Sequence, residues 1–200
     1  MIHVYKNLET LLPALADFVV TTARESIERD GRFNFVLSGG GSPKRLYELL
    51  TTDTYRNLIE WKNVCFFFGD ERYVPLDHPD SNFRMAKNSL FTPLGIAKEQ
   101  IVEVNTALSP AAAALDYEHR IRRHFNNSDC RFDLILLGLG DNSHTASLFP
   151  HTTVLHEKKA LVKEVFVEEV KMYRMTFTAP LINAAHSIVF LVYGKSKAEA

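Results

Sequence analysis

The sequence predicts an α/β fold in which a mainly parallel sheet carries helices on both faces. Continuous apolar runs of strand length recur along the chain, which is typical of strands buried on both sides. These runs alternate with segments of helical periodicity, which favours parallel strands joined by helices. Four of the runs end in glycine and polar residues. Because the carboxyl ends of parallel strands meet at one edge of a sheet, we expect these endings to form one composite site.

The first half of the chain predicts a long helix followed in sequence by two buried strands. Apolar residues recur every three or four positions over residues 8–27, which predicts an amphipathic helix that ends at Gly31. Residues 33–37 and 64–68 then predict buried strands. A charged loop, residues 69–75, is expected after the second of them.

The second half continues the alternation. A helix is predicted to begin at Ser109-Pro110, since proline suits the first helical position. Residues 134–137 predict a buried strand, and 160–167 and 172–178 predict further strands. Residues 187–193 form the last apolar run, which ends in Gly194 and lysines.

A glycine-rich loop follows the first strand, and it suits an anion. Ser42 is a natural cap for the next helix, with Pro43 at its first position. Free amides at a helix start favour a phosphate, although glycine runs are also common in ordinary turns. The spacing is not that of a P-loop. The residues of this loop that we expect near a ligand are Ser38, Gly39, Gly40, Gly41 and Ser42.

His144 lies seven residues after Leu137, the last apolar residue of a predicted strand. A lone histidine is more often a surface or core residue than a functional one. Its place beyond the carboxyl end of a strand favours function, because ligands of open α/β sheets bind there. We expect His144 to open a short helix, and because the unperturbed pKa of a histidine is near 6.5, it suits general base catalysis.

Composition limits the partners of the chain. Its 200 residues fit a single domain spanning 1–200, and 23 Lys and Arg against 24 Asp and Glu leave no basic excess for nucleic acid or membranes. Cys65 and Cys130 lack CxxC spacing, which favours a reducing compartment. No signal segment or membrane-spanning run is evident. We expect a cytoplasmic protein without nucleic-acid or membrane partners, as a monomer or a homodimer.

Three familiar chemistries fit these motifs poorly. Residues 138–143 approach the dinucleotide pattern G-x-G-x-x-G, but Ser143 replaces the third glycine. Ser38 lacks the preceding glycine of a hydrolase nucleophile elbow. The spacings of His144, His151 and His156 do not follow a metal-site pattern, so neither a metal nor another cofactor is expected. A phosphorylated small molecule, on which His144 moves a proton, fits the remaining polar groups best.

Three motifs together resemble the 6-phosphogluconolactonase family. They are Ser-Gly-Gly-Gly-Ser-Pro at 38–43, Gly-Asp-Glu-Arg-Tyr-Val-Pro at 69–75 with its continuation to Asn82, and Gly-Leu-Gly-Asp-Asn-Ser-His-Thr-Ala-Ser-Leu-Phe-Pro at 138–150. The resemblance implies a Rossmann-like fold shared with glucosamine-6-phosphate deaminases. It also implies hydrolysis of the sugar-phosphate lactone 6-phospho-D-glucono-1,5-lactone to 6-phosphogluconate in the oxidative pentose phosphate pathway.

The resemblance also implies residue roles. His144 would activate water against the lactone carbonyl, and Asp70 and Arg72 would orient the substrate or stabilise charge near that carbonyl. Asn82 would contact sugar hydroxyls. The glycine loop would hold the phosphate, with two cationic partners, Arg174 and Lys197.

Two departures from the family pattern stand out. The family usually has Asp-Gly-His where this chain has Asn142-Ser143-His144, so Asn142 or Asp141 must take over any orienting role. The family also continues with another helical segment after the region of Lys197. Either the sequence is short or this C-terminal element is missing here.

Two rival functions are weighed against the lactonase. A deaminase-isomerase of the same fold would use an acidic residue shortly after the histidine, and no carboxylate occurs between His144 and Glu157. A non-catalytic sugar-phosphate sensor is the other rival. The replacement of Asp-Gly by Asn142-Ser143 favours a sensor, whereas the intact His144 and Asp70-Glu71-Arg72 favour an enzyme.

Overall fold

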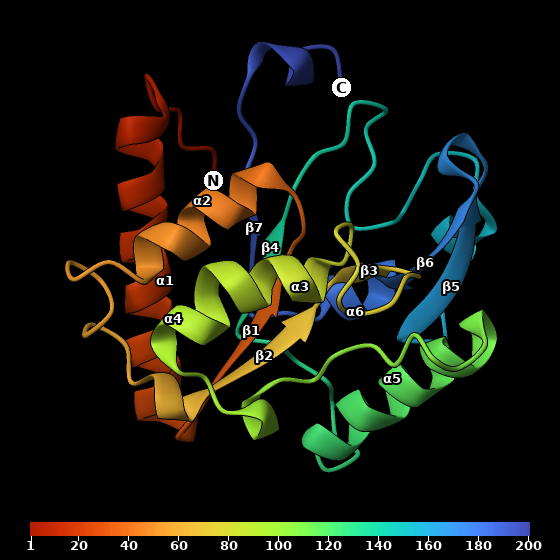
Figure 1. Ribbon diagram of the computed structural model, residues 1–200, viewed down its shortest axis with the longest axis horizontal. Coiled ribbons are helices and arrows are strands. Elements are labelled where there is room, and N and C mark those ends of the chain that lie inside the picture. The colour runs from red at the N-terminus through yellow and green to blue at the C-terminus, as the bar shows by residue number, and fades with distance from the viewer.

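A computed structural model describes residues 1–200, apart from the side chain of Ser196. Its centre is a four-stranded parallel sheet in the order β2-β1-β4-β7. Beside it lies a three-stranded antiparallel sheet in the order β3-β6-β5 (Figure 1). The strands are β1 (Phe33–Leu37), β2 (Val64–Phe68), β3 (Asp70–Arg72), β4 (Leu134–Leu137), β5 (Val162–Val167), β6 (Met172–Phe177) and β7 (Ser187–Phe190).

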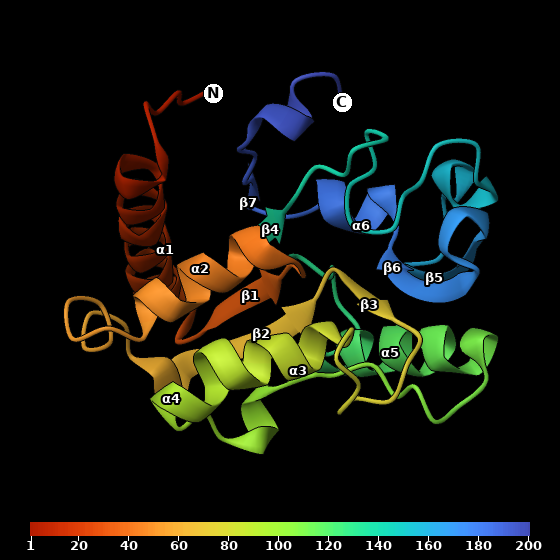
Figure 2. The ribbon, with the colours of Figure 1, turned by 45° about the horizontal axis from the view of Figure 1, so that its top comes forward.

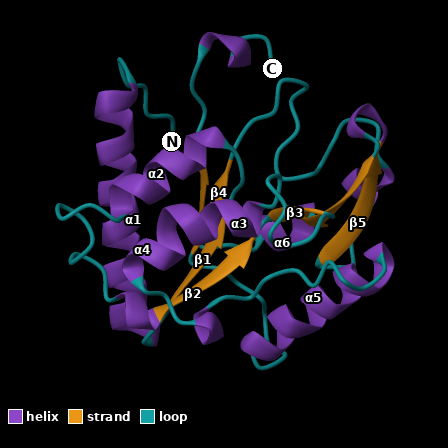
Figure 3. Ribbon diagram, viewed as in Figure 1, coloured by secondary structure: helices purple, strands orange, loops and turns teal.

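Helices cover both faces of the parallel sheet, as predicted. Figures 2 and 3 show α1, α2 and α3 on one side and α5 on the other. The α-helices are α1 (Leu8–Asp30), α2 (Gly41–Leu50), α3 (Asn82–Ala86), α4 (Thr92–Leu94), α5 (Pro110–His124) and α6 (Ala179–Asn183). A π-helical turn, η2 (Lys87–Phe91), joins α3 to α4.

The alternation of side chains along β1 divides the core into two clusters. Phe33, Phe35 and Leu37 point to the cluster formed with α1 and α2, whereas Val36 points to the cluster formed with α5 and β6. All four side chains are fully buried. Strands that are apolar on both faces therefore report the layered architecture directly.

Gly69 joins the two sheets. Its N–H donates to the carbonyl of Leu37 in the parallel sheet, and its carbonyl accepts from Phe177 in the antiparallel sheet. The chain therefore passes from β2 straight into β3. The prediction of a charged loop at 69–75 is therefore wrong for Asp70, Glu71 and Arg72, which form strand β3 and pair with β6.

Three expected local details are wrong. Helix α2 begins at Gly41 with Gly40 as its N-cap, so Ser42 does not cap it and Pro43 is not its first residue. The reason is Gly40, whose φ of 100° turns the chain into the helix early. No helix begins at His144, because the left-handed φ values of 64° at Ser143 and 48° at Ala146 interrupt any helical path.

The remaining elements agree closely with the sequence-based predictions. Strands β1, β2 and β4 have the predicted bounds, and α1 and α5 begin where predicted. Strand β7 stops at Phe190, three residues earlier than expected. In the described part of the chain, no helix is both long enough and apolar enough to cross a membrane.

Candidate active site

A cleft of about 590 Å³ opens at the carboxyl ends of β1 and β4, against the antiparallel sheet. Figure 1 shows the connection after β4 rising between the C-terminal segment and that sheet. The cleft is lined by these predicted site residues: Ser38, Gly39, Gly40, Asp70, Arg72, His144, Arg174 and Lys197. Three others, Gly41, Ser42 and Asn82, do not line it. The composite site expected from the strand endings is thus present as one cavity.

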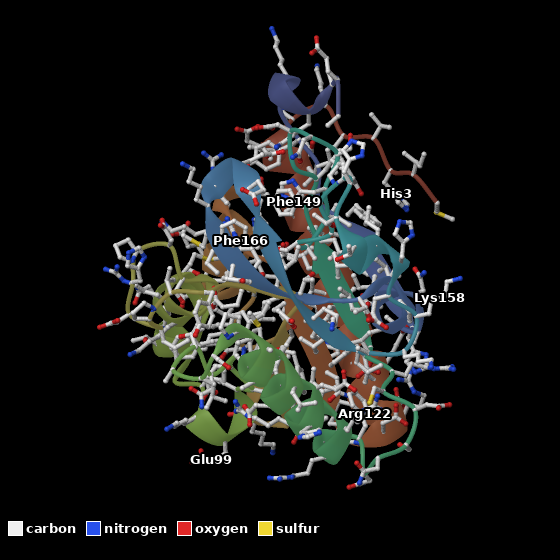
Figure 4. The ribbon with its side chains drawn as sticks, turned by 90° about the vertical axis from the view of Figure 1, so that its right-hand side faces the viewer. His3, Glu99, Arg122, Phe149, Lys158 and Phe166 are labelled. Carbon is white, nitrogen blue, oxygen red and sulfur yellow. The ribbon has the colours of Figure 1, made fainter. Side chains whose placement is uncertain are left out.

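The ring of His144 is held on three sides. It stacks on Phe149 with centroids 3.9 Å apart and planes 19° apart. Its Nδ1 lies 2.5 Å from Oδ1 of Asn142. On the third side Gly140 comes so close that a Cβ there would lie 2.0 Å from the ring. Figure 4 labels Phe149, which lies toward the end of the molecule opposite to Arg122 of α5. The ring therefore has little freedom to turn.

The environment of His144 favours its neutral form. Partial burial lowers the pKa of the imidazole below 6.5, and the positive charges of Arg174 and Lys197 lower it further. The carboxylates of Asp70 and Glu169 oppose this effect and raise the pKa. Desolvation is the largest contribution, so His144 is unprotonated at neutral pH and can accept a proton.

Asp70 is fixed by donors from two different segments. The hydroxyl of Ser147 donates to Oδ2 over 2.7 Å. The amide of Asn82 donates to the Asp70 backbone carbonyl over 2.9 Å and to Oδ1 over 3.3 Å. Asn82 is itself buried and lies so close to Gly39 that a Cβ there would come within 2.0 Å of its Oδ1. Asn82 therefore supports Asp70 and the glycine loop from behind the cleft.

Arg72 and Arg174 form a cationic pair. They lie directly opposite each other on β3 and β6, although like charges in that position repel. Burial lowers the pKa of Arg174, and the charge of Arg72 lowers it further. Among the described residues, the buried Nε of each arginine has no hydrogen-bond partner. Both arginines line the cleft, and two adjacent guanidinium charges there suit an anionic ligand.

Glu71 points away from the cleft and organises the start of α3. Its carboxylate accepts hydrogen bonds from the N–H groups of Asn82 (2.7 Å), Phe83 (2.8 Å) and Arg72 (2.8 Å). Burial raises its pKa to about 7. Glu71 therefore fixes Arg72 and Asn82 in position by holding their backbones.

The glycine loop presents a helix start without a side-chain cap. The N-cap residue Gly40 has no side chain that could accept from the first amides of α2, and the first turn of α2 has no acidic residue. The side-chain hydroxyl of Tyr47 anchors the loop, since it accepts from the N–H of Ser38 and donates to its carbonyl, each over 2.9 Å. The amides at this end of α2 are thus available to an anion.

Lys197 reaches the cleft from the C-terminal segment but already has a partner. Its Nζ lies 2.5 Å from Oδ1 of Asp141 and lowers the pKa of that exposed carboxyl. Asp141 therefore pairs with Lys197, and Asn142 is the residue that contacts His144. Within the described residues, no group of three or more His, Cys, Asp or Glu side chains is arranged to hold a metal ion.

Sequence reasoning missed two contributors to the site. Glu169, in the short η5 turn (Glu168–Val170) between β5 and β6, accepts from the amide of Asn142. Ser147 holds Asp70. Ser147 lies in the family-like motif at 138–150, so its place in that motif could have marked it as a site residue. No sequence pattern marks Glu169, because only the fold brings the η5 turn to the cleft.

Comparison with known proteins agrees with this architecture. The family described as glucosamine-6-phosphate isomerases/6-phosphogluconolactonase matches residues 6–200. The chain is 41% identical over 203 residues to a 6-phosphogluconolactonase of Synechocystis, with all of this chain and 82% of the relative covered. A Nostoc 6-phosphogluconolactonase is 38% identical with the same coverage. The crystal structure of the Thermotoga maritima 6-phosphogluconolactonase superposes with a TM-score of 0.81 at 32% identity, covering 93% of this chain and 81% of the other. This chain belongs to the family of glucosamine-6-phosphate isomerases and 6-phosphogluconolactonases.

Proposed function

We propose that this protein hydrolyses 6-phospho-D-glucono-1,5-lactone to 6-phospho-D-gluconate in the oxidative pentose phosphate pathway, with His144 as the general base. The observation that carries the proposal is the geometry of His144: it lines the cleft, its Nδ1 lies 2.5 Å from Oδ1 of Asn142, and its Nε2 has no hydrogen-bond partner among the described residues. Partial burial also lowers its pKa, which favours the form that accepts a proton. The relatives named 6-phosphogluconolactonase support the substrate class. The free cysteines Cys65 and Cys130 favour the cytoplasm as the compartment.

The reaction needs one water and one base. Nε2 of His144 takes a proton from water while the water oxygen bonds to the lactone carbonyl carbon, and a negative charge develops on the carbonyl oxygen. When the bond from this carbon to the ring oxygen breaks, the imidazolium returns the proton to that oxygen. The product is an open-chain carboxylic acid, which ionises at neutral pH. Asp70, fixed by Ser147 and Asn82, is suited to orient the substrate.

The phosphate of the substrate accounts for the cationic side of the cleft. Arg72 and Arg174 are adjacent on β3 and β6 and both line the cleft, so we place both on one anionic group, the phosphate dianion. The amides at the start of α2 and the ammonium of Lys197 would complete the phosphate site. In this arrangement the phosphate anchors the substrate, and His144 meets the lactone carbonyl.

The test is hydrolysis of freshly generated lactone, coupled to 6-phosphogluconate dehydrogenase and corrected for spontaneous opening. Wild type should exceed the background, and His144→Ala should not. His156→Ala is the matched control, since His156 is exposed in the η4 turn (Thr153–His156) and lies outside the cleft. This control should retain wild-type activity.

Two other results would overturn the proposal. If wild type binds a phosphorylated analogue but does not exceed the background, the chain is a sugar-phosphate sensor. If it instead turns over glucosamine 6-phosphate, it belongs to the isomerase branch of its family.

A further inference from the structure

Asn142 has two hydrogen-bonding ends, and each end has a different partner. Its Oδ1 lies 2.5 Å from Nδ1 of His144. Its Nδ2 lies 3.0 Å from both carboxylate oxygens of Glu169. Asn142 therefore connects the histidine to a carboxylate that is 27 residues further along the chain.

The chemistry of Glu169 fixes the orientation of this amide. A carboxylate only accepts hydrogen bonds, so the NH₂ group of Asn142 must face it. The amide oxygen of Asn142 must then face His144. Because an amide oxygen only accepts, Nδ1 of His144 has to carry the proton, and Nε2 keeps its lone pair.

We propose that Glu169 is a positioning residue for catalysis: through Asn142 it selects the tautomer of His144 whose Nε2 is the base. The proposal rests on the assignment of His144 as general base. It explains how a chain with Asn142-Ser143 before its histidine keeps that histidine oriented. In this chain Glu169 of the η5 turn supplies the carboxylate, and it acts on His144 through Asn142. In the family pattern an aspartate stands at the position of Asn142.

The charge of Glu169 has a second effect. When His144 takes the proton, the new positive charge is stabilised by the nearby carboxylates of Glu169 and Asp70 and opposed by Arg174 and Lys197. Removing Glu169 takes away one of these carboxylates and leaves those of Asp70 and Asp141 near the ring. The pKa of His144 should then fall further below its usual value.

The test compares Glu169→Ala with Glu168→Ala. Glu168 is the exposed neighbour in the same turn, so the control removes the same charge without touching Asn142. Glu169→Ala should lower kcat about three- to tenfold, the usual value of one oriented hydrogen bond, with KM within about twofold. Its acid limb of kcat/KM should move to lower pH. Glu168→Ala should change none of these.

A readout that does not need activity separates this proposal from the assignment of His144 as base. Nitrogen NMR of the His144 ring should show Nδ1 protonated in wild type and a mixture of tautomers in Glu169→Ala. Glu169→Gln is the second variant, for use if Glu169→Ala folds poorly. Its side chain has the same size but can donate as well as accept, so it no longer fixes the orientation of Asn142, and a mixture of tautomers is expected again.

The outcomes are distinct. If His144→Ala stays active, the proposed function fails. If His144→Ala is inactive but the tautomer and the acid limb are unchanged in both Glu169 variants, the positioning role of Glu169 is overturned.

Discussion

Replacing Gly140 by alanine should displace the His144 ring, to which we assign the role of base, while leaving the backbone unstrained. A Cβ at this position would lie 2.0 Å from the His144 ring, whereas an ordinary contact begins near 3.4 Å. The ring must therefore move by the difference, about 1.4 Å. It cannot move far toward the opposite side, where it stacks on Phe149 at 3.9 Å. A misplacement of about 1 Å costs roughly 100-fold in rate, so kcat/KM should fall about 100-fold, or about 2.7 kcal/mol in activation free energy.

The same loop supplies the control. A Cβ on Gly138 would meet no heavy atom within 4 Å, and Gly138, like Gly140, does not have a positive φ. Gly138→Ala should keep activity within about twofold in the coupled lactonase assay and should melt near the wild-type temperature. The reasoning is refuted if Gly140→Ala retains more than about a third of wild-type kcat/KM, or if Gly138→Ala loses as much.

Three further predictions concern the surroundings of the site. Tyr47→Phe leaves the buried N–H and carbonyl of Ser38 without their partner and should cost about 1–3 kcal/mol of unfolding free energy in denaturant titration; an unchanged midpoint contradicts this. Arg174→Met should raise KM at least about tenfold for the phosphorylated lactone, by loss of a charge-assisted hydrogen bond, and leave hydrolysis of unphosphorylated gluconolactone unchanged; equal effects on both lactones rule out a phosphate contact. Burial lowers the pKa of His124 to about 4 in the folded protein. As the pH falls, the unfolded state therefore takes up a proton at His124 before the folded state does. Stability should fall between pH 6.5 and 4, and His124→Gln should reduce that slope; an unchanged slope excludes His124 as its source.

The parallel sheet was predictable because its signal is local. Strands β1, β2 and β4 are apolar at every position except the buried Asn34 of β1, a pattern typical of strands covered on both faces. The antiparallel sheet was harder to predict from the sequence, because β3 has only three residues, Asp70, Glu71 and Arg72. A charged tripeptide has no strand periodicity, and its pairing with β6 depends on the fold.

The site divides in the same way. His144, Asp70 and the glycine loop could be found because they follow strands, and strand ends converge. The start of α2 was misplaced because the φ of Gly40 overrides the capping preference of Ser42. Glu169 was missed because its turn approaches His144 only after β5 and β6 pair. Sequence thus located the side chains to which we assign the reaction, and tertiary structure was needed to find the groups that contact and orient them.

The central claim is that neutral His144 is the base, and the pH dependence of kcat/KM for lactone hydrolysis tests it most directly. Because burial lowers the pKa of His144 in the folded protein, the neutral form persists below pH 6.5. We predict a single-proton acid limb with its midpoint below 6.5 in wild type, and no such limb in the residual rate of His144→Ala. A midpoint above 6.5, or the same limb in the variant, would contradict the account.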